Sequence, residues 1–339
     1  MLLSIVIPSF KRHTELHRLL YTIYYAGLEK DQYEVIISDD SPLEERNKDL
    51  ADYFSDWMNI KYTVNTNSLH APGSNRQNGL NQAEGKWVTF IDDDDSVREN
   101  SLKSLVDIMD SDEKYSIIKT HHLTEEIDGT IHFEEPGFLF KTLTHGKIYC
   151  REFLEKYNIH YNVDSMAHED VFFNYSVESA TMYDKEYNAV VCTDEQYRFY
   201  QFRRTPNSLS RTPGFYNKYI VEDAEHFLGK FSNPFFFCKI AIEENRPEVV
   251  RDIFEFIYNE LCYAVIIYIL SKNDWDCLTE ENNNYYFRFF NSWKYCFAGR
   301  IDINMMYRQA ITTLYENGHI NNPANVREYF SIIDRCCIK

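Results

Sequence analysis

Four consecutive aspartates, Asp92 to Asp95, follow directly on the apolar residues 87–91. The apolar residues suit a buried strand, so the four carboxylates arrive where that strand is expected to end. Like charges packed this closely repel one another, and a fold that gathers them usually supplies a cation or another counter-charge. Ligands of open α/β sheets bind beyond the carboxyl ends of the strands. Alone, the stretch predicts a metal and ligand site or, as the alternative, a solvated acidic turn.

Other polar groups in the chain could contribute to the same metal and ligand site. Pro8-Ser9 and Asp39-Asp40 each end an apolar run, and Arg203-Arg204 follows an extended one. Glu169 and Asp170 precede a run with helical spacing, where the helix dipole favours carboxylates. A helix cap would explain this last pair equally well.

The elements that must position these groups alternate along the chain. Strands are expected at residues 2–7, 33–38, 60–64, 87–91 and 115–119, and residues 189–192 and 196–202 also have an extended pattern. Helices are expected at residues 11–27, 44–58, 74–83 and 101–109. This alternation with short connections predicts a mostly parallel sheet flanked by helices. Right-handed crossovers then bring Pro8-Ser9, Asp39-Asp40 and the four aspartates to one edge of the sheet, which favours a site over a turn.

The character of the chain changes near residue 212. Strand patterns give way to helical ones at residues 216–231, 247–270, 283–297, 303–317 and 326–334. We therefore expect an α/β domain over residues 1–212 and a helical C-terminal domain over residues 213–339. The aromatic stripes of the helical part suggest packing, acceptor binding or self-association into a homo-oligomer.

Composition excludes several classes of protein. The 339 residues carry a formal net charge of −18, which does not suit general binding to nucleic acid. The eight cysteines form no C-x-x-C pair, so neither a zinc site nor a redox dithiol is indicated. The longest apolar run, residues 261–270, is too short to span a bilayer. Reduced cysteines and a strand-like N-terminus predict a cytoplasmic protein. Peripheral association with the inner face of a membrane is the alternative location.

Six segments, taken in order, resemble the family-2 glycosyltransferases, which are inverting enzymes of the GT-A fold. They are residues 4–10, 33–41, 73–88, 90–95, 168–170 and 200–210. The resemblance covers the N-terminal two-thirds of the chain and implies a nucleotide-sugar donor with Mn²⁺ or Mg²⁺. Residues 197–211 lack the late histidine that some members use as a metal ligand, and we leave the lone His168 out of the metal set. His121 and His122 are candidates for the acceptor side.

The resemblance assigns roles to the acids. Asp95 is the expected direct metal ligand, and Asp94 and Asp92 bind the metal, the ribose or a neighbouring group. Asp40, with Asp39 as the alternative, accepts a hydrogen bond from the N3–H of a uracil ring. Carboxylate oxygens select Mg²⁺ or Mn²⁺ over zinc.

The remaining roles concern the base, the diphosphate and the acceptor. The floor beneath the nucleobase is expected from Pro8, Ser9 and Phe10. Four arginines are expected to face the nucleotide or its diphosphate: Arg12, Arg76, Arg203 and Arg204. Asp170, with Glu169 as the alternative, is the expected general base that takes the proton of the acceptor hydroxyl.

Together these features predict a metal-dependent inverting glycosyltransferase. It would move a sugar from a nucleotide donor, most simply a UDP-sugar, to an acceptor hydroxyl in glycan or surface polysaccharide synthesis. Three alternatives stay open: the same chemistry on a protein or hydroxylated nucleobase, a non-catalytic sugar-nucleotide-binding module, and a nucleotidyltransferase. The last would need a glycine-rich phosphate loop after the first strand, and residues 8–12 contain no glycine.

Overall fold

The computed structural model describes residues 1–67, 70–133, 142–166, 168–205, 224–271 and 285–300, together with Arg308 and Thr312. The chain divides into two compact units, Met1–Pro213 and Gly214–Lys339. The division lies beside the expected boundary. The expected helices at 303–317 and 326–334 lie almost wholly outside the described residues.

A seven-stranded sheet forms the centre of the first unit, in the order β10-β6-β9-β4-β1-β2-β3. Its strands are β1 Leu3–Ser9, β2 Tyr33–Asp39, β3 Ile60–Val64, β4 Trp87–Phe90, β6 Tyr115–Thr120, β9 Lys147–Cys150 and β10 Asn188–Cys192. All neighbours pair in parallel except β9, which runs antiparallel to both β4 and β6. The mixed α/β architecture confirms the expected fold class, although β9 is a strand that the sequence pattern did not predict.

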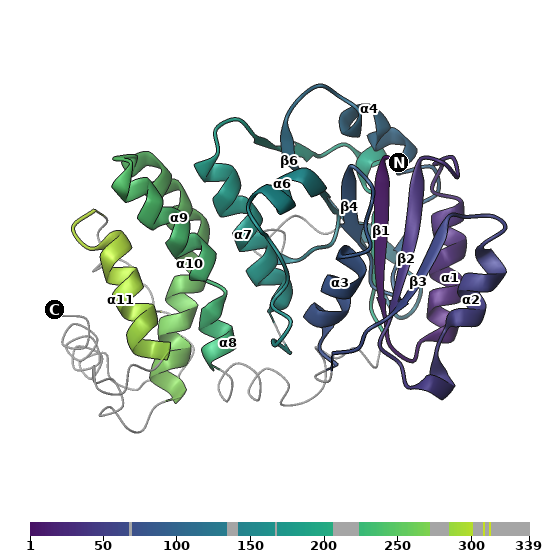
Figure 1. Ribbon diagram of the computed structural model, residues 1–339, viewed down its shortest axis with the longest axis horizontal. Coiled ribbons are helices and arrows are strands. Elements are labelled where there is room, and N and C mark those ends of the chain that lie inside the picture. The colour runs from purple at the N-terminus through teal and green to yellow at the C-terminus, as the bar shows by residue number, and fades with distance from the viewer. Residues whose placement is uncertain are drawn as a thin grey trace. The chain divides into compact units, whose positions relative to one another are not determined.

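Helices cover both faces of this sheet, with α1 and α2 on one side and α3 and α7 on the other (Figure 1). The helices of the first unit are α1 His13–Tyr24, α2 Lys48–Phe54, α3 Pro72–Leu80, α4 Val106–Met109, α6 Arg151–Lys156 and α7 Glu169–Tyr183. Short 3₁₀ turns occur at Leu43–Glu45, Lys103–Leu105 and Glu195–Tyr197. α1 buries Leu16, Leu19, Leu20 and Ile23, the spacing that places side chains on one face of a helix.

The expected helix at residues 44–58 is divided in the structure. A 3₁₀ turn ends at Glu45, and α2 begins only at Lys48. Between them, the backbone N–H of Asn47 donates to Asp39 Oδ2 at 2.7 Å. This bond ties the chain to the end of β2, so the two helical pieces cannot join.

The order of the strands locates the binding edge. From β1 the chain moves outward to β2 and β3, then crosses back to β4 on the other side of β1. In open α/β sheets this reversal opens a crevice at the carboxyl ends of the two central strands. Here that position lies between Ser9, the last residue of β1, and the acidic run that follows β4.

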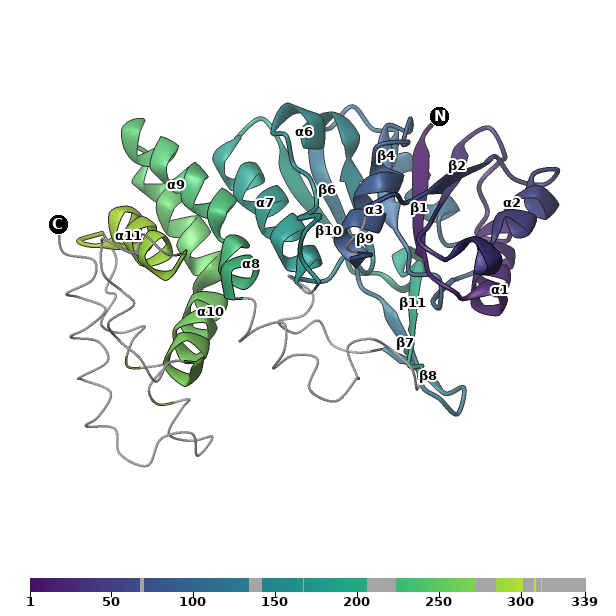
Figure 2. The ribbon, with the colours of Figure 1, turned by 60° about the horizontal axis from the view of Figure 1, so that its bottom comes forward.

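A second, four-stranded sheet lies beside this edge, in the order β5-β11-β7-β8 (Figure 2). Its strands are β5 Ser96–Val97, β7 Leu123–Glu125, β8 Ile131–Phe133 and β11 Tyr200–Arg203. β5 follows the acidic run directly and pairs with β11 through Tyr200–Val97 and Gln201–Ser96. This pairing brings a late segment of the chain against the acids.

The second unit is helical in its described part. Its helices are α8 Ala224–Gly229, α9 Ser232–Glu243, α10 Pro247–Ser271 and α11 Tyr285–Phe297. α9 was not predicted, although Pro234 in its first turn is a usual helix-start signal. Aromatic side chains fill the interior, with Phe235 close to Phe231, Phe289 and Phe297. Among the described helices of the chain, none has both the length and the apolar character that crossing a bilayer requires.

Candidate active site

The four aspartates after β4 face in different directions. Asp93 accepts a hydrogen bond from the Phe10 backbone N–H at 3.1 Å and contacts Arg12 Nη1 at 3.0 Å. Asp94 lies 2.5 Å from the same Arg12 nitrogen and accepts a bond from the Thr205 hydroxyl. Arg12, expected to face the nucleotide, is therefore paired with two of the acids. These pairs fix the loop after β1 against the acidic run.

Asp92 is paired with a second arginine. Arg76 Nη2 contacts Asp92 Oδ1 at 2.6 Å, and Arg76 Nη1 contacts Glu169 Oε1 at 2.5 Å. Burial would raise the pKa of Asp92, but Arg76 and His145 outweigh it and hold the pKa below its ordinary value. Asp92 is therefore ionised at neutral pH. The fork geometry of one guanidinium joins the acidic run to the Glu-Asp pair.

Asp95 has no cationic partner among the described residues. Its carboxylate accepts hydrogen bonds from the Tyr200 hydroxyl and from the Arg203 backbone N–H, the latter at 2.8 Å. Burial and the nearby charges of Asp92 and Asp94 raise its pKa well above the ordinary value. Asp95 is the member of the run whose ionised form most needs an added positive charge.

His145 completes a group of potential metal ligands. Three potential ligand atoms lie within 4.8 Å of one another, one each from Asp92, Asp95 and His145. Carboxylate and imidazole donors together fit a divalent ion such as Mn²⁺. His145 was not among the predicted site residues. It lies in the loop before β9, and only the unpredicted pairing of β9 with β4 brings it to this edge.

The Glu-Asp pair begins α7 on the other side of Arg76. Burial raises the pKa of Glu169 to about 7, and burial also raises the pKa of Asp170. Asp170 Oδ1 accepts a hydrogen bond from the Val171 backbone N–H at 2.7 Å. Within the part of the chain that the structure describes, no group donates to Asp170 Oδ2. His168, just before the pair, has a positive φ of 62°, a conformation that few residues other than glycine adopt.

The two aspartates at the end of β2 differ in what they can still bind. Asp39 accepts bonds from the backbone N–H groups of Ser41 and Asn47 and from the Tyr62 hydroxyl. Asp40 contacts His70 Nδ1 at 2.8 Å. Asp39 therefore stabilises its own loop, whereas Asp40 contacts an exposed imidazole that a ligand could displace. This difference favours Asp40 as the residue that faces a nucleobase.

The segment at the end of β1 lies next to Asp40. Ser9 is buried and accepts a hydrogen bond from the Asn47 amide at 3.1 Å. Pro8 is half-buried, and the ring of Phe10 is 48% exposed. An exposed aromatic ring beside a strand end is a suitable surface for a nucleobase.

Arg203 and Arg204, expected to bind the diphosphate, are paired elsewhere in the structure. Arg203 contacts Glu125 at 2.7 Å and Arg204 contacts Glu126 at 3.0 Å. Both arginines are thus held against β7 and the residue that follows it. His121 and His122 lie nearby, with the His122 ring 5.8 Å from that of His145.

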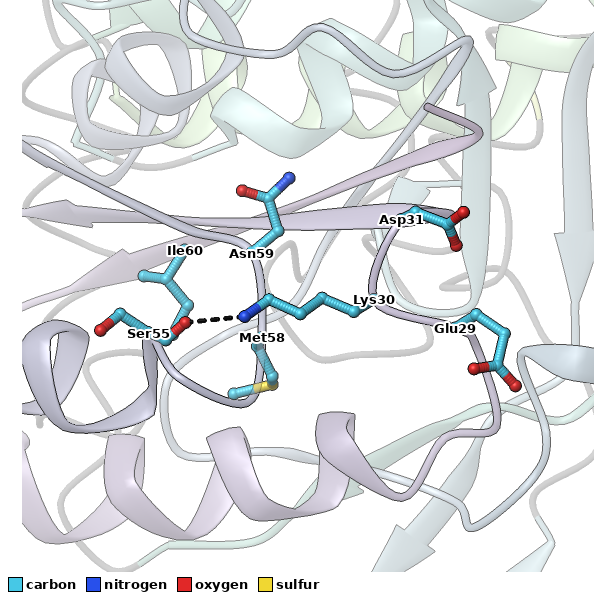
Figure 3. A pocket seen from close by; sticks show the side chains of 7 residues that line it. All are labelled: Glu29, Lys30, Asp31, Ser55, Met58, Asn59 and Ile60. Atoms are coloured by element: carbon cyan, nitrogen blue, oxygen red, sulfur yellow. Dashed lines mark hydrogen bonds between the residues drawn. The ribbon is translucent and has the colours of Figure 1, made fainter.

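A surface pocket of about 670 Å³ lies at the opposite edge of the sheet (Figure 3). It is lined by residues that precede β2 and β3, among them Lys30 and Asn59. Lys30 Nζ donates to the carbonyl oxygens of Ser55 and Asp56, both at 2.9 Å, so this lysine caps a chain turn. The pocket lies away from the clustered acids, and we do not assign the donor site to it.

An open sheet that reverses direction beside a cluster of carboxylates fits the GT-A class of α/β fold. Residues 4–168 match the family model described as glycosyl transferase family 2. This part of the chain is similar to that family.

Proteins with similar sequences are named as glycosyltransferases. A GalNAc(5)-diNAcBac-PP-undecaprenol beta-1,3-glucosyltransferase of Campylobacter jejuni is 36% identical over 104 residues, which are 31% of this chain and 33% of that protein. The poly(ribitol-phosphate) beta-N-acetylglucosaminyltransferase TarS of Staphylococcus aureus is 25% identical over 107 residues, 32% of this chain and 18% of that protein. The matched segment is thus a third or less of these relatives.

Solved structures share the fold over most of the chain. Crystal structures of S. aureus TarS 1-349 alone and with UDP-GlcNAc have TM-scores of 0.64 and 0.66, both at 16% identity. Each covers 98% of this chain, and the chain covers 91% and 92% of theirs.

Proposed function

We propose that this protein is a metal-dependent inverting glycosyltransferase that takes a sugar from a nucleotide-sugar donor, a UDP-sugar, and transfers it to an acceptor hydroxyl. One observation carries the proposal: Arg76 joins an acid of the run after β4 to the Glu-Asp pair of α7. A transferase of this kind needs one group of residues for the leaving diphosphate and another for the attacking hydroxyl. Arg76 holds two such groups side by side.

The leaving-group side consists of Asp92 and Asp95. Their carboxylates suit Mn²⁺ or Mg²⁺, and Asp95 lacks a counter-charge among the described residues. A bound cation would supply charge neutralisation for the departing diphosphate. Arg12 with Asp93 and Asp94 holds the loop that places Phe10 beneath the nucleobase, and Asp40 accepts the base N–H.

On the acceptor side, Asp170 acts as the general base. Its Oδ2 accepts the proton of the acceptor hydroxyl while the hydroxyl oxygen attacks the anomeric carbon from the face opposite the leaving group. Glu169 forms an ion pair with Arg76, and this pair holds the first turn of α7 in place. Burial raises the pKa of Asp170, which brings it nearer to the value of an effective base at neutral pH.

The acceptor is proposed from the names of the relatives. One relative is named for an undecaprenol-linked glycan and another for poly(ribitol-phosphate). We propose a glycan or surface-polymer hydroxyl as the acceptor, reached at the cytoplasmic face of a membrane. Residues 1–212 would form the GT-A domain, and residues 213–339 would bind the acceptor or associate with a second copy.

A thermal-shift screen tests the proposal. The wild-type protein is melted with UDP, GDP, UDP-glucose and UDP-GlcNAc, each with MnCl₂ or with EDTA. A ligand at 100 times its Kd stabilises the folded state by about 2.7 kcal/mol, so a uracil nucleotide with Mn²⁺ should raise the Tm by several degrees. The Asp95→Asn variant should lose the Mn²⁺-dependent part of this shift.

The control is Asp164→Asn, which changes an exposed acid of the same unit. It should keep the full shift. If no uracil nucleotide shifts the Tm of the wild-type protein under either condition, the donor assignment is wrong. If UDP shifts the Tm equally in EDTA, the metal dependence is wrong.

A further inference from the structure

The imidazole of His145 stacks on two aromatic rings of β11. The Tyr200 ring lies 4.6 Å from it at 16°, and the Phe202 ring lies 5.2 Å from it at 25°. The side chain is 11% exposed. Its Nδ1 is buried and, among the described residues, has no hydrogen-bond partner. The stack, rather than a hydrogen bond, therefore sets the orientation of the ring.

The other ring nitrogen points toward the acids. His145 Nε2 lies 3.9 Å from Asp92 Oδ2, which is longer than a hydrogen bond. Two atoms that each bind one ion at about 2.1 Å can lie up to about 4.2 Å apart. The 3.9 Å separation therefore fits two ligands of one cation better than a direct hydrogen bond.

Tyr200 contacts both His145 and Asp95. Its ring stacks on His145, and its hydroxyl donates a hydrogen bond to Asp95. A carboxylate oxygen can accept more than one bond, so Asp95 can still bind an ion. One residue of β11 thus orients both an oxygen ligand and the nitrogen beside it.

We propose that His145 Nε2 is a nitrogen ligand of the cation site, with Asp92 and Asp95, and that it gives the site a preference for Mn²⁺ over Mg²⁺. Imidazole suits transition-metal ions, whereas Mg²⁺ prefers oxygen ligands and water. The inference rests on the proposed function, because it assumes that the site binds a cation together with a nucleoside diphosphate. The competing explanation is that His145 only pairs with Asp92.

Electron spin echo spectroscopy of bound Mn²⁺ distinguishes the two explanations. The protein is loaded with MnCl₂ and UDP, and the echo is examined for modulation by a directly bound ¹⁴N nucleus. The wild-type protein should show this modulation. His145→Phe, which keeps an aromatic ring that can stack on Tyr200 and Phe202, and His145→Gln should both lose it.

Calorimetry of the same proteins measures the preference. With UDP present, His145→Gln should bind Mn²⁺ at least about 10-fold more weakly, while Mg²⁺ affinity changes less than about 3-fold. The control is His13→Gln, because His13 also pairs with an aspartate, Asp49, at 2.8 Å but is exposed. It should leave both affinities unchanged.

Each other outcome contradicts a defined statement. A wild-type echo without ¹⁴N modulation, or equal loss of Mn²⁺ and Mg²⁺ affinity in His145→Gln, overturns the inference and leaves the proposed function standing. Binding of neither ion by the wild-type protein with UDP overturns the metal dependence and the inference with it. Circular dichroism and a metal-free melt confirm that each variant is folded.

Discussion

Arg76 and Glu169 form a buried ion pair, with 2.5 Å between Nη1 and Oε1, although they lie 93 positions apart in the chain. The second arm of the same guanidinium contacts Asp92. Burial lowers the pKa of Arg76, but the carboxylates outweigh it and leave the pKa well above the ordinary value. Arg76 is therefore a permanent cation between the two halves of the site. It sets the position of α7 relative to the end of β4.

Arg76→Lys should disable the proposed sugar transfer. Lysine keeps the charge but cannot contact two carboxylates in a fixed fork. We expect kcat/KM to fall at least about 100-fold and the free energy of unfolding to fall by about 3 kcal/mol, since a buried carboxylate loses its partner. Steady-state kinetics and urea unfolding measure both. Arg98→Lys, at an exposed pair with Glu195, is the control and should change neither by much. Full activity of Arg76→Lys would refute the bridging role.

Asp170→Asn should separate binding from transfer. Asparagine has nearly the same shape but cannot accept the acceptor proton, so kcat should fall between about 10² and 10⁴-fold. The Kd for UDP, measured by calorimetry, should stay within about 3-fold of wild type. Glu169→Gln tests the alternative base. A larger kcat loss in Glu169→Gln than in Asp170→Asn, at equal stability, would transfer the role to Glu169.

The pH dependence of the reaction follows from the same residues. A base must be ionised, so the rate should fall as pH decreases through its pKa. Because burial raises the pKa of Asp170, and that of Glu169 to about 7, this acid limb should lie above the ordinary carboxyl range near 4. A limb below pH 4 in kcat/KM would show that neither group is the base.

Gly73→Ala should damage the site through its packing. A Cβ at Gly73 would clash with the carbonyl oxygen of Asn162 and lie 2.9 Å from Cβ of Glu169. The start of α7 would then move, and a misplacement of about 1 Å can cost about 100-fold in rate. We expect kcat/KM to fall by that order and the free energy of unfolding by about 1 to 3 kcal/mol. Gly229→Ala, where an added Cβ meets nothing within 4 Å, is the matched control.

The sequence predicted where the acids gather because that follows from short-range patterns. Apolar strands ended by polar residues, joined by helices of the usual length, determine which strand ends share an edge. What each of the four aspartates contacts could not be predicted in this way. Asp92 to Asp95 lie in a turn, so their directions depend on Arg12, Arg76 and Tyr200 from distant parts of the chain.

His145 shows a second limit. Nothing in its local sequence distinguishes it from His121, His122 or His168. Its position depends on the short strand β9, which inserts antiparallel between β4 and β6. An inserted antiparallel strand breaks the β-α alternation that carried the prediction.

Glu34 provides a test of stability away from the site. Its buried carboxylate accepts bonds from the Ser4 hydroxyl and the Glu84 backbone N–H and pairs with Lys61 at 2.8 Å. Burial would raise the pKa of Glu34, but these partners outweigh it and lower the pKa. The folded state is therefore stabilised above the unfolded pKa of about 4.3, and this stabilisation is lost as pH falls through the lower folded value.

Glu34→Gln should consequently lose about 2 kcal/mol of unfolding free energy at pH 7, and the deficit should shrink as pH falls below about 4. Urea unfolding at pH 7 and at pH 3.5 measures both values. Glu84→Gln is the matched control, because Glu84 contacts the same Lys61 at 3.0 Å with a side chain that is 68% exposed. Its loss should stay below about 0.5 kcal/mol at either pH. A deficit in Glu34→Gln that grows as the pH falls would reverse the sign of the pKa shift and contradict this account of the buried network.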